Sequence, residues 1–373
     1  MRIGIDARFY GSIGKGLGRY TERLIKHLEK IAMADEFVIF LRKENFEEYQ
    51  PQAKNFSKKL ADFSWYSFSE QKHFPPVIKS ANLDLMHYPH FNVPLFTPKP
   101  FIVTVHDLIL THFPTRRAST LGPIKYYFKQ LAYKIVLSRA IQNAEQILTV
   151  SEFTKQDIQK FFGYDPQKIT VTYEAVEAFL RPQMPEPQIL EKYKIAKPYL
   201  LYVGNAYPHK NLEKLIEFMK KLPASHQNFQ MVIVCKPDYF LKRLQAEVEA
   251  SGLINKFNFP GFIPDAELGV LYRQAHAYIF PSLYEGFGIP PLEAMSQGTP
   301  VLSSNVACLQ EVLGEAAIYF NPHDANAMID ALIGLDQNPN SRQVIITKGH
   351  EQVGRYSWDK LAETTLKIYH QAK

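Results

Sequence analysis

The chain has 373 residues, of which 46% are hydrophobic and 21% are charged, and its formal net charge is +6. This length and balance are typical of about two globular domains and exclude a disordered chain, and the modest charge gives no reason to expect nucleic acid as a partner. The two cysteines, Cys235 and Cys308, lie far apart in sequence, so we expect a reducing compartment with no disulfide framework and no metal site.

The N-terminus, Met1 to Asp6, is predicted to form a first strand and lacks the apolar core of a signal peptide. No apolar run approaches the roughly 20 residues that a membrane helix needs. We therefore expect a cytoplasmic protein whose contact with the inner face of a membrane, if it has one, is peripheral.

Short apolar, β-rich runs alternate with longer amphipathic segments through the first half of the chain. The predicted strands are residues 2–5, 37–41, 101–105 and 146–150, and the predicted helices are residues 18–31, 121–141 and 152–162. Such alternation is typical of a parallel sheet covered by helices. Ser151 is expected to cap the third helix, which starts at Glu152.

Three prolines within residues 181–187 interrupt this pattern and predict a stiff linker. The alternation then restarts, with strands at 199–203, 231–234, 277–280 and 301–303 and helices at 212–222, 240–251, 266–274 and 290–297. We predict two doubly wound α/β domains, residues 1–180 and 188–356, with a cleft between them. Ligands of such sheets bind at the carboxyl ends of the strands.

The strongest pattern lies between Phe280 and Gly298, where a strand, a glycine-bearing turn and a helix that starts with two prolines follow one another. The N-terminus of this helix would favour a phosphate group. We predict that Glu293, in the first turn, and Glu285, before it, accept hydrogen bonds from hydroxyl groups. A plain strand–turn–helix would explain Glu293 through the helix dipole but not Glu285. A glycosidase carboxylate pair is a third interpretation, which the phosphate-type turn disfavours.

A second pattern runs from Gly204 to Leu212, between a predicted strand and a helix for which Asn211 is the expected N-cap. Lys210 places a cation just outside this helix end. The alternative interpretation is a solvated surface lysine. A third pattern, Gly14 to Tyr20, opens the first helix, but its spacing is not G-x-G-x-x-G and does not indicate NAD. His106 follows the strand 101–105, so it is either a ligand-binding residue or an ordinary loop histidine.

Glu285 and Glu293, with seven residues between them, resemble the E-x7-E motif of family 4 retaining glycosyltransferases. Matching segments follow the family's order over most of the chain, at residues 16–20, 106–107, 150–152, 208–212 and 298–301. The resemblance implies the GT-B fold, which has two facing Rossmann-like domains and an interdomain cleft. It also implies a nucleotide-sugar donor as substrate, no cofactor and no catalytic metal.

The resemblance assigns a role to each candidate site residue. Lys210 binds the donor diphosphate and stabilises the leaving group, His106 contacts the transferred sugar and Glu285 binds sugar hydroxyls, so these three are the predicted catalytic residues. The other donor-binding residues that it implies are Gly16 (phosphates), Phe287, Gly288 and Ile289 (sugar and phosphate, through their backbone) and Glu293 (ribose). Phe262 is predicted to frame the base because the stretch 261–263 follows a short predicted strand. Asn205 is also predicted to bind the donor. It stands where many relatives have an arginine, so either Lys210 does more of the electrostatic work or another cation substitutes.

Two further segments concern partners and domain coupling. Residues 121–134 are basic and aromatic and predict an amphipathic helix suited to anionic lipid or a lipid-linked acceptor. The alternative is an ordinary packed helix whose lysines face water. The resemblance also implies that the last helix, within residues 357–373, packs back on the first domain and couples the two domains.

The predicted reaction moves a hexose from a nucleoside diphosphate sugar to a glycan or lipid-linked acceptor, with retention at the anomeric carbon. Similarity to bacterial mannosyltransferases of polysaccharide and O-antigen assembly favours GDP-mannose, and UDP-glucose or another UDP-hexose is the alternative donor. A nucleotide-sugar epimerase, a phosphorylase with pyridoxal and a non-catalytic nucleotide-binding protein remain as other interpretations.

Overall fold

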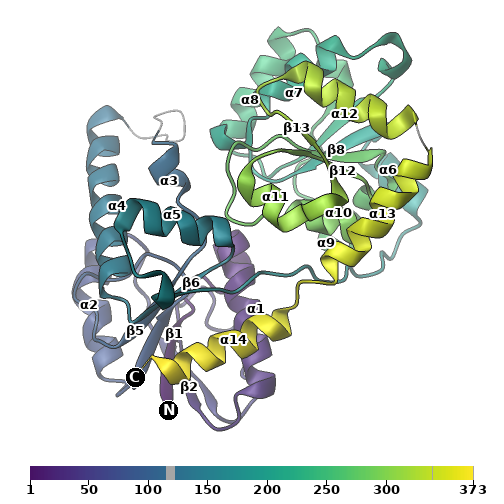
Figure 1. The fold of residues 1–373 in the computed structure, drawn as a ribbon. Coiled ribbons are helices and arrows are strands. Elements are labelled where there is room, and N and C mark those ends of the chain that lie inside the picture. The colour runs from purple at the N-terminus through teal and green to yellow at the C-terminus, as the bar shows by residue number, and fades with distance from the viewer. Residues whose placement is uncertain (115–121, 338, 373) are drawn as a thin grey trace. The chain divides into compact units, whose positions relative to one another are not determined.

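The computed structural model describes residues 1–114, 122–337 and 339–372, and the chain forms two compact units. Unit 1 comprises Met1–Leu108, Leu121–Glu174 and Ser357–Lys373, and unit 2 comprises Ile109–Thr120 and Ala175–Tyr356. Each unit is a parallel sheet with helices on both faces (Figure 1). The α/β alternation predicted from the sequence is therefore confirmed.

Unit 1 contains a seven-stranded sheet with the order β3-β2-β1-β4-β5-β6-β7. Its strands are β1 (Arg2–Asp6), β2 (Glu36–Leu41), β3 (Phe56–Leu60), β4 (Leu85–Tyr88), β5 (Phe101–Val105), β6 (Gln146–Thr149) and β7 (Ile169–Val171). The four strands expected from the sequence are confirmed, and β3, β4 and β7 are additions. Because helices cover both faces, a central strand such as β5 is buried at every residue.

The helices of unit 1 lie in two layers. α1 (Lys15–Ile31) and the last helix, α14 (Trp358–Gln371), lie side by side on one face of the sheet, whereas α2 (Phe68–Lys79) and α4 (Pro123–Asn143) cover the other (Figure 1). α5 (Glu152–Phe162) starts as predicted, with the Ser151 hydroxyl accepting a hydrogen bond from the Thr154 N–H. Leu121, the expected start of the second helix, lies outside the described residues.

Side-chain contacts hold α14 in unit 1, as the resemblance implies. The His27 ring of α1 lies 2.5 Å from the Asp359 carboxylate, and the Tyr369 hydroxyl lies 2.7 Å from His87 Nδ1 in β4. The pKa of His87 is lowered to about 3, because burial disfavours its charged form and the His106 charge adds to the effect. The neutral ring and the tyrosine therefore tie the end of the chain to the centre of the sheet.

Unit 2 contains a six-stranded sheet with the order β10-β9-β8-β11-β12-β13. Its strands are β8 (Tyr199–Val203), β9 (Gln230–Val234), β10 (Phe257–Asn258), β11 (Ala277–Phe280), β12 (Val301–Ser304) and β13 (Ala317–Phe320). α7 (Glu213–Lys221), α8 (Tyr239–Ala250) and α12 (Ala325–Gln337) lie on one face, and α9 (Asp265–Gln274), α10 (Ile289–Ser296) and α13 (Pro339–Val353) lie on the other.

Three shorter helices complete this unit, namely α3 (Ile109–His112), α6 (Glu186–Lys192) and α11 (Ala307–Leu313). The prediction of a linker up to residue 187 is wrong at its end, because α6 already starts at Glu186. Pro187 fits there, since the first helical turn needs no N–H from it. Among the described residues, no helix has an apolar stretch long enough to cross a membrane.

Candidate donor site

The strand order of unit 2 reverses between β8 and β11. From β8 the chain proceeds to β9 and β10 on one side, and from β11 it proceeds to β12 and β13 on the other. The loops that follow two such neighbouring strands diverge, and this point at the carboxyl edge of the sheet is where open α/β folds bind ligands. The loop after β8 contains Lys210, and the loop after β11 contains Glu285.

Lys210 and Glu285 form a close ion pair at this point. Lys210 Nζ lies 2.6 Å from Oε1 and 2.8 Å from Oε2 of Glu285. Their side chains are 14% and 9% exposed, so the pair is largely desolvated. The Leu283 N–H donates to the His209 carbonyl at 2.7 Å and joins the two loops. The structure therefore brings together two of the three predicted catalytic residues.

Asn211 does not cap α7, contrary to the prediction. The chain makes a short 3-10 turn, Pro208–Lys210, and Asn211 follows it in the left-handed region with φ of 59°, while α7 begins later, at Glu213. The Asn211 amide instead donates to the carbonyls of Pro281 and Pro322, at 3.1 and 2.8 Å. Asn211 thus ties the Lys210 loop to the loops that follow β11 and β13.

The start of α10 offers backbone donors beside this pair. Gly288 has φ of +100°, and a Cβ there would lie 2.8 Å from Leu309 Cδ2, so the turn requires glycine. Pro290 and Pro291 supply no N–H to the helix end. The N–H groups of Gly288 and Ile289 find no acceptor among the residues that the structure describes. The predicted phosphate-binding helix end therefore depends on these two donors.

Glu293 lies in the second turn of α10, not in the first, because the helix begins at Ile289. Its carboxylate is buried and accepts a hydrogen bond of 2.9 Å from the Tyr272 hydroxyl. Phe287, between the two glutamates, is also buried, and its ring packs edge-on against Tyr356. Its side chain anchors the turn, which leaves only its backbone for a ligand.

The remaining predicted residues of unit 2 follow the neighbouring strands. Asn205, after β8, uses its side-chain oxygen to accept a 3.4 Å hydrogen bond from the Tyr207 N–H. Phe262, beyond β10, has an exposed ring, and Lys236 Nζ lies 5.0 Å from its centroid. Sequence reasoning missed Lys236, although a lysine just after the strand 231–234 indicates a second cation at this edge.

In unit 1, His106 follows β5 and has a partner at each ring nitrogen. Nδ1 lies 3.1 Å from Glu174 Oε1, and Nε2 lies 2.9 Å from the Pro89 carbonyl. Burial lowers the pKa of His106, but the hydrogen bond and charge of Glu174 outweigh it, so the pKa is raised. Both partners are acceptors, which favours the doubly protonated ring, and contact with a sugar would require exchange of a partner.

Gly16 lies in the first turn of α1, where a Cβ would meet no atom within 4 Å. Gly18 is different, since a Cβ there would lie 2.0 Å from the Gly11 carbonyl oxygen. Of the two, Gly18 is required by packing, whereas Gly16 leaves open space beside its backbone. The predicted helix start at Gly18 is three residues too late, because α1 begins at Lys15 and its first turn contains Gly16.

A buried ion cluster, which sequence reasoning missed, occupies the point where the strand order of unit 1 reverses. Arg8, after β1, donates to the Asp6 carboxylate at 2.7 and 2.8 Å and to Glu70 at 2.6 Å. Asn92, after β4, donates to the same Glu70 oxygen at 2.7 Å, and the Tyr66 N–H donates to the other at 2.9 Å. The cluster fixes the loops at the carboxyl edge of this sheet.

Two family models match successive parts of the chain. The model described as Glycosyltransferase Family 4 matches residues 14–178, and the model described as Glycosyl transferases group 1 matches residues 185–352. The chain is 30% identical over 295 residues to a phosphatidyl-myo-inositol mannosyltransferase of Mycobacterium leprae, covering 78% of this chain and 74% of that protein. The chain belongs to the family 4 glycosyltransferases.

This glycosyltransferase is also 28% identical over 363 residues to the O-antigen chain mannosyltransferase RfbU of Salmonella typhimurium, covering 95% of each chain. Among solved structures, it resembles sucrose-phosphate synthase from Thermosynechococcus elongatus, with a TM-score of 0.79, 19% identity and coverage of 100% and 98% of the two chains. It also resembles Anabaena HepE in complex with UDP and glucose, with a TM-score of 0.75, 14% identity and 99% coverage of each chain. The fold is GT-B.

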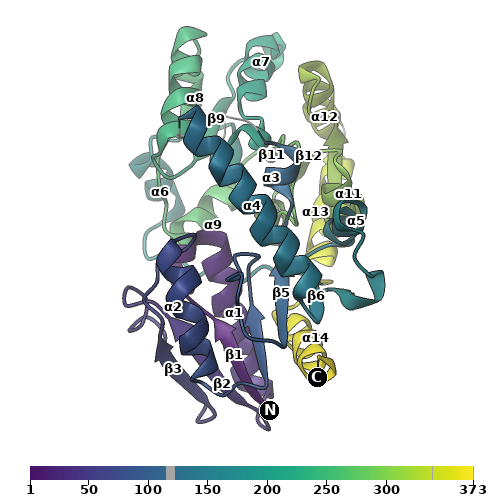
Figure 2. The same ribbon diagram turned by 90° about the vertical axis from the view of Figure 1, so that its left-hand side faces the viewer.

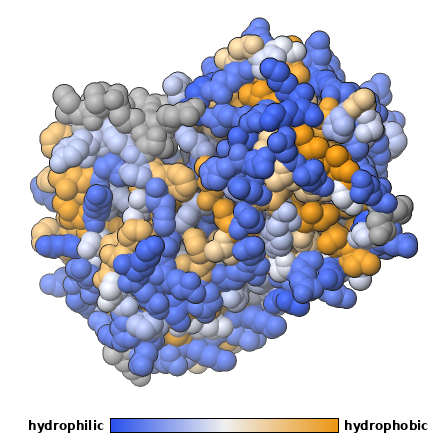
Figure 3. Space-filling view, turned by 45° about the horizontal axis from the view of Figure 1, so that its top comes forward, coloured by the Kyte–Doolittle hydropathy of each residue, from blue (hydrophilic) through white to orange (hydrophobic). Residues whose placement is uncertain are grey.

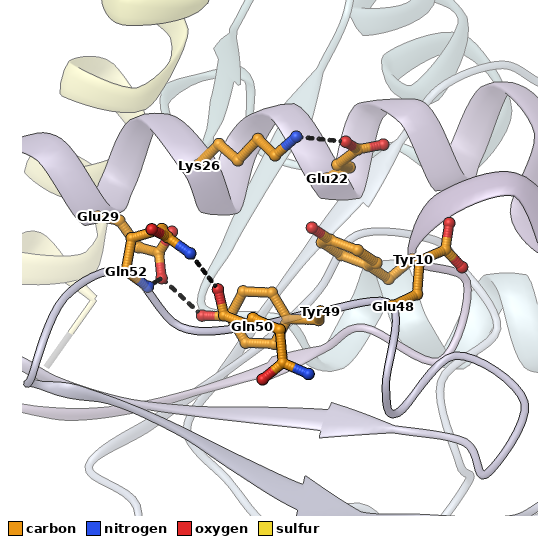
Figure 4. Close-up of a pocket in the computed structure, with 8 residues that line it drawn as sticks. All are labelled: Tyr10, Glu22, Lys26, Glu29, Glu48, Tyr49, Gln50 and Gln52. Carbon is orange, nitrogen blue, oxygen red and sulfur yellow. Dashed lines mark hydrogen bonds and ion pairs between the residues drawn. The ribbon is translucent and has the colours of Figure 1, made fainter.

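The glycosyltransferase has a pocket of about 230 Å³ in unit 1, between α1 and the segment after β2 (Figure 4). It contains none of the predicted site residues. Its Glu29 already accepts hydrogen bonds from the Tyr49 hydroxyl and the Gln52 N–H, and Glu22 pairs with Lys26. Within the described ranges, no three His, Cys, Asp or Glu side chains are grouped so that they could hold a metal ion.

Proposed function

We propose that this protein transfers a hexose from a nucleoside diphosphate sugar to a glycan or lipid-linked acceptor, and that unit 2 binds the donor. The observation that supports this most is the Lys210–Glu285 pair where the strand order of unit 2 reverses. A lysine beside unpaired backbone N–H groups suits a diphosphate, because both favour negative charge. A carboxylate at the same place suits the hydroxyl groups of the attached sugar.

The Lys210 ammonium has the charge to stabilise the nucleoside diphosphate as it leaves. A diphosphate competes with Glu285 for this ammonium, and a carboxylate released in this way can accept hydrogen bonds from sugar hydroxyls. Negative charge develops on the leaving phosphate oxygen as the bond to the anomeric carbon breaks, and preorganised donors stabilise that charge. We assign this role to Lys210 and to the N–H groups of Gly288 and Ile289.

The proposed reaction retains the anomeric configuration. The acceptor hydroxyl approaches the face from which the phosphate departs, its oxygen forms the new bond to the anomeric carbon, and its proton passes to the departing phosphate oxygen. No resident cofactor and no metal are needed in this scheme, because Lys210 and the backbone donors supply the positive charge. His106 and Gly16 of unit 1 are proposed, on the family resemblance, to contact the sugar and the phosphates.

GDP-mannose is the proposed donor, because the relatives RfbU and the M. leprae protein are mannosyltransferases. A UDP-hexose is the alternative, since HepE, a protein of the same fold, binds UDP and glucose. The exposed Phe262 ring with Lys236 above it is a platform on which either base could stack. Glu293 is proposed to hold the ribose. A ribose hydroxyl would donate a hydrogen bond to the Glu293 carboxylate, either in place of the Tyr272 hydroxyl or together with it.

The test is a panel of GDP- and UDP-linked hexoses, with release of the nucleoside diphosphate followed by chromatography. Slow hydrolysis without an acceptor should select one base, GDP being expected. Conversion of one nucleotide sugar into another, without release of nucleotide, would instead identify an epimerase. Glu285→Ala should reduce release severely, and full activity in this variant would remove Glu285 from the site.

A further inference from the structure

Helix α4 has two apolar faces. One face packs in unit 1, where Tyr133, Leu137 and Ile141 are buried, with exposed fractions of 9%, 1% and 0%. The other carries four large apolar side chains with exposed fractions of 67%, 64%, 46% and 45%, namely Tyr127, Phe128, Leu131 and Ile135. We call these four residues the outer stripe.

The outer stripe lies opposite the packed face. Residues two apart on an α-helix project about 200° from each other, so Leu131 and Ile135 point away from the side on which Tyr133 and Leu137 are buried. Tyr127, Leu131 and Ile135 are each four apart and form one row. Figure 2 shows α4 at the front of unit 1, and Figure 3 shows hydrophobic residues gathered on the left-hand face, over this helix.

An ordinary packed helix turns a polar face to water, so packing within the unit explains the buried face but not the outer stripe. Single exposed apolar residues are common on protein surfaces, whereas four on one face of a helix indicate a binding surface.

The charges around the stripe favour an anionic partner. Lys129, Lys134 and Arg139 are exposed on the same helix, and no carboxylate of the described residues pairs with any of them. The sequence contains no acidic residue from Leu108 to Ala144. A second copy of this face is a poor partner, because a symmetric contact would bring these cations against their own copies.

We propose that α4 binds the surface of a bilayer containing anionic lipids, with the outer stripe inserted among the acyl chains. Lys129, Lys134 and Arg139 contact the phosphate groups. A helix with apolar side chains on one face and cations beside them has the chemistry of an interfacial helix. This surface extends the proposed function, since it would hold the enzyme where a lipid-linked acceptor is found, but it does not depend on the identity of the donor.

The test is co-sedimentation of the full chain with vesicles of phosphatidylcholine containing one third phosphatidylglycerol, and with vesicles of phosphatidylcholine alone. The wild type should bind the first and bind the second much more weakly. The double variant Leu131→Gln/Ile135→Gln should lower the partition coefficient about tenfold or more, because two inserted apolar side chains are lost. Lys134→Glu should lower it at least about fivefold.

Matched controls separate this surface from a general change in the protein. Met33→Gln changes an exposed apolar residue that is not in α4, and Lys242→Glu reverses an exposed cation in unit 2, so both should bind like the wild type. Raising the salt from about 0.1 M to about 1 M should weaken wild-type binding, since screening shortens the reach of the charges.

Equal binding of the wild type and both α4 variants would overturn the proposal, as would equal binding to neutral and anionic vesicles. If the wild type self-associates and Leu131→Gln/Ile135→Gln is monomeric, a second copy covers the stripe and the lipid proposal is wrong. Hydrolysis of the donor in solution should be unchanged in these variants. A failure of vesicle binding is therefore distinguishable from a failure of the proposed transferase activity.

Discussion

Replacing Lys210 with methionine tests whether the Lys210–Glu285 pair binds a diphosphate or only stabilises unit 2. The change keeps most of the length of the side chain but leaves the Glu285 carboxylate, whose side chain is 9% exposed, without its cation. Breaking a buried ion pair costs about 3 to 5 kcal/mol, and we take the lower value because Lys210 is 14% exposed. For a domain of this size, about 3 kcal/mol lowers the melting temperature by roughly 9 °C.

Turnover of Lys210→Met should fall about 10²- to 10³-fold, the usual effect of removing one donor that stabilises developing negative charge. The double variant Lys210→Met/Glu285→Gln removes the unpaired charge as well. We expect it to recover most of the lost stability while its turnover stays low. Stability is measured by thermal unfolding followed by circular dichroism, and turnover by release of GDP or UDP from the donor.

The control is Lys242→Met, which removes an exposed lysine of α8 and should change neither property. If the double variant recovered turnover together with stability, the pair would have a structural role only. The assignment of the diphosphate to Lys210 would then be wrong.

Three further predictions follow from the structure. Arg8→Met should lower the free energy of unfolding, measured in urea, by about 4 kcal/mol, because it leaves two buried carboxylates without their cation. Arg2→Met, which breaks an exposed pair with Glu36, should lower it by less than about 1 kcal/mol. Equal losses in the two variants would contradict this prediction. In the folded protein the pKa of His106 is raised above 6.5. The ion pair between protonated His106 and Glu174 therefore stabilises the fold below pH 6.5, and this stabilisation is lost as the pH rises through the folded pKa. The variant His106→Gln should lack this loss, and an unchanged dependence of stability on pH would refute the pairing. The folded pKa of His87 is about 3, so stability should fall as the pH drops from 6.5 towards 3, and His87→Gln should reduce that slope by up to about 1.4 kcal/mol per pH unit.

Metal removal provides a separate test of the proposed reaction. Treatment with EDTA should leave donor turnover unchanged, because the proposed charge stabilisation comes from Lys210 and backbone donors. Loss of turnover with EDTA, restored by Mg²⁺ or Mn²⁺, would contradict the metal-independent scheme.

The sequence predicts strands best where both faces of the sheet are covered. β5 and β8 are continuous apolar runs, which is the composition that a buried parallel strand requires. β3 was missed because it is an edge strand with two lysines and only partial burial. α2 was missed because Pro75 and Pro76 lie inside it, and prolines are normally a reason to end a helix.

The sequence predicts which loops contribute residues to the candidate site, but it does not predict which side chains contact one another there. The pattern placed Lys210 and Glu285 after two strands, yet their pairing depends on β8 and β11 being neighbours, which only the sheet order reveals. Asn211 was misassigned because a 3-10 turn delays the start of α7. The Glu174 partner of His106 lies 68 residues away in sequence, and no local pattern joins the two.

The buried cluster around Arg8 is another set of contacts that could not be predicted from local sequence patterns. Asp6 and Arg8 are adjacent to a predicted strand, but Glu70 belongs to α2, a helix that the sequence pattern did not predict. The role of the Glu70 carboxylate follows only from the structure, in which α2 brings it to Arg8 at the end of β1.

A crystal structure of the protein with bound GDP or UDP would test the central claim most directly. It should show the diphosphate oxygens within hydrogen-bonding distance of Lys210 Nζ and of the N–H groups of Gly288 and Ile289, with the Glu285 carboxylate displaced from the lysine. A diphosphate bound away from the loops that follow β8 and β11, with the ion pair intact, would contradict it.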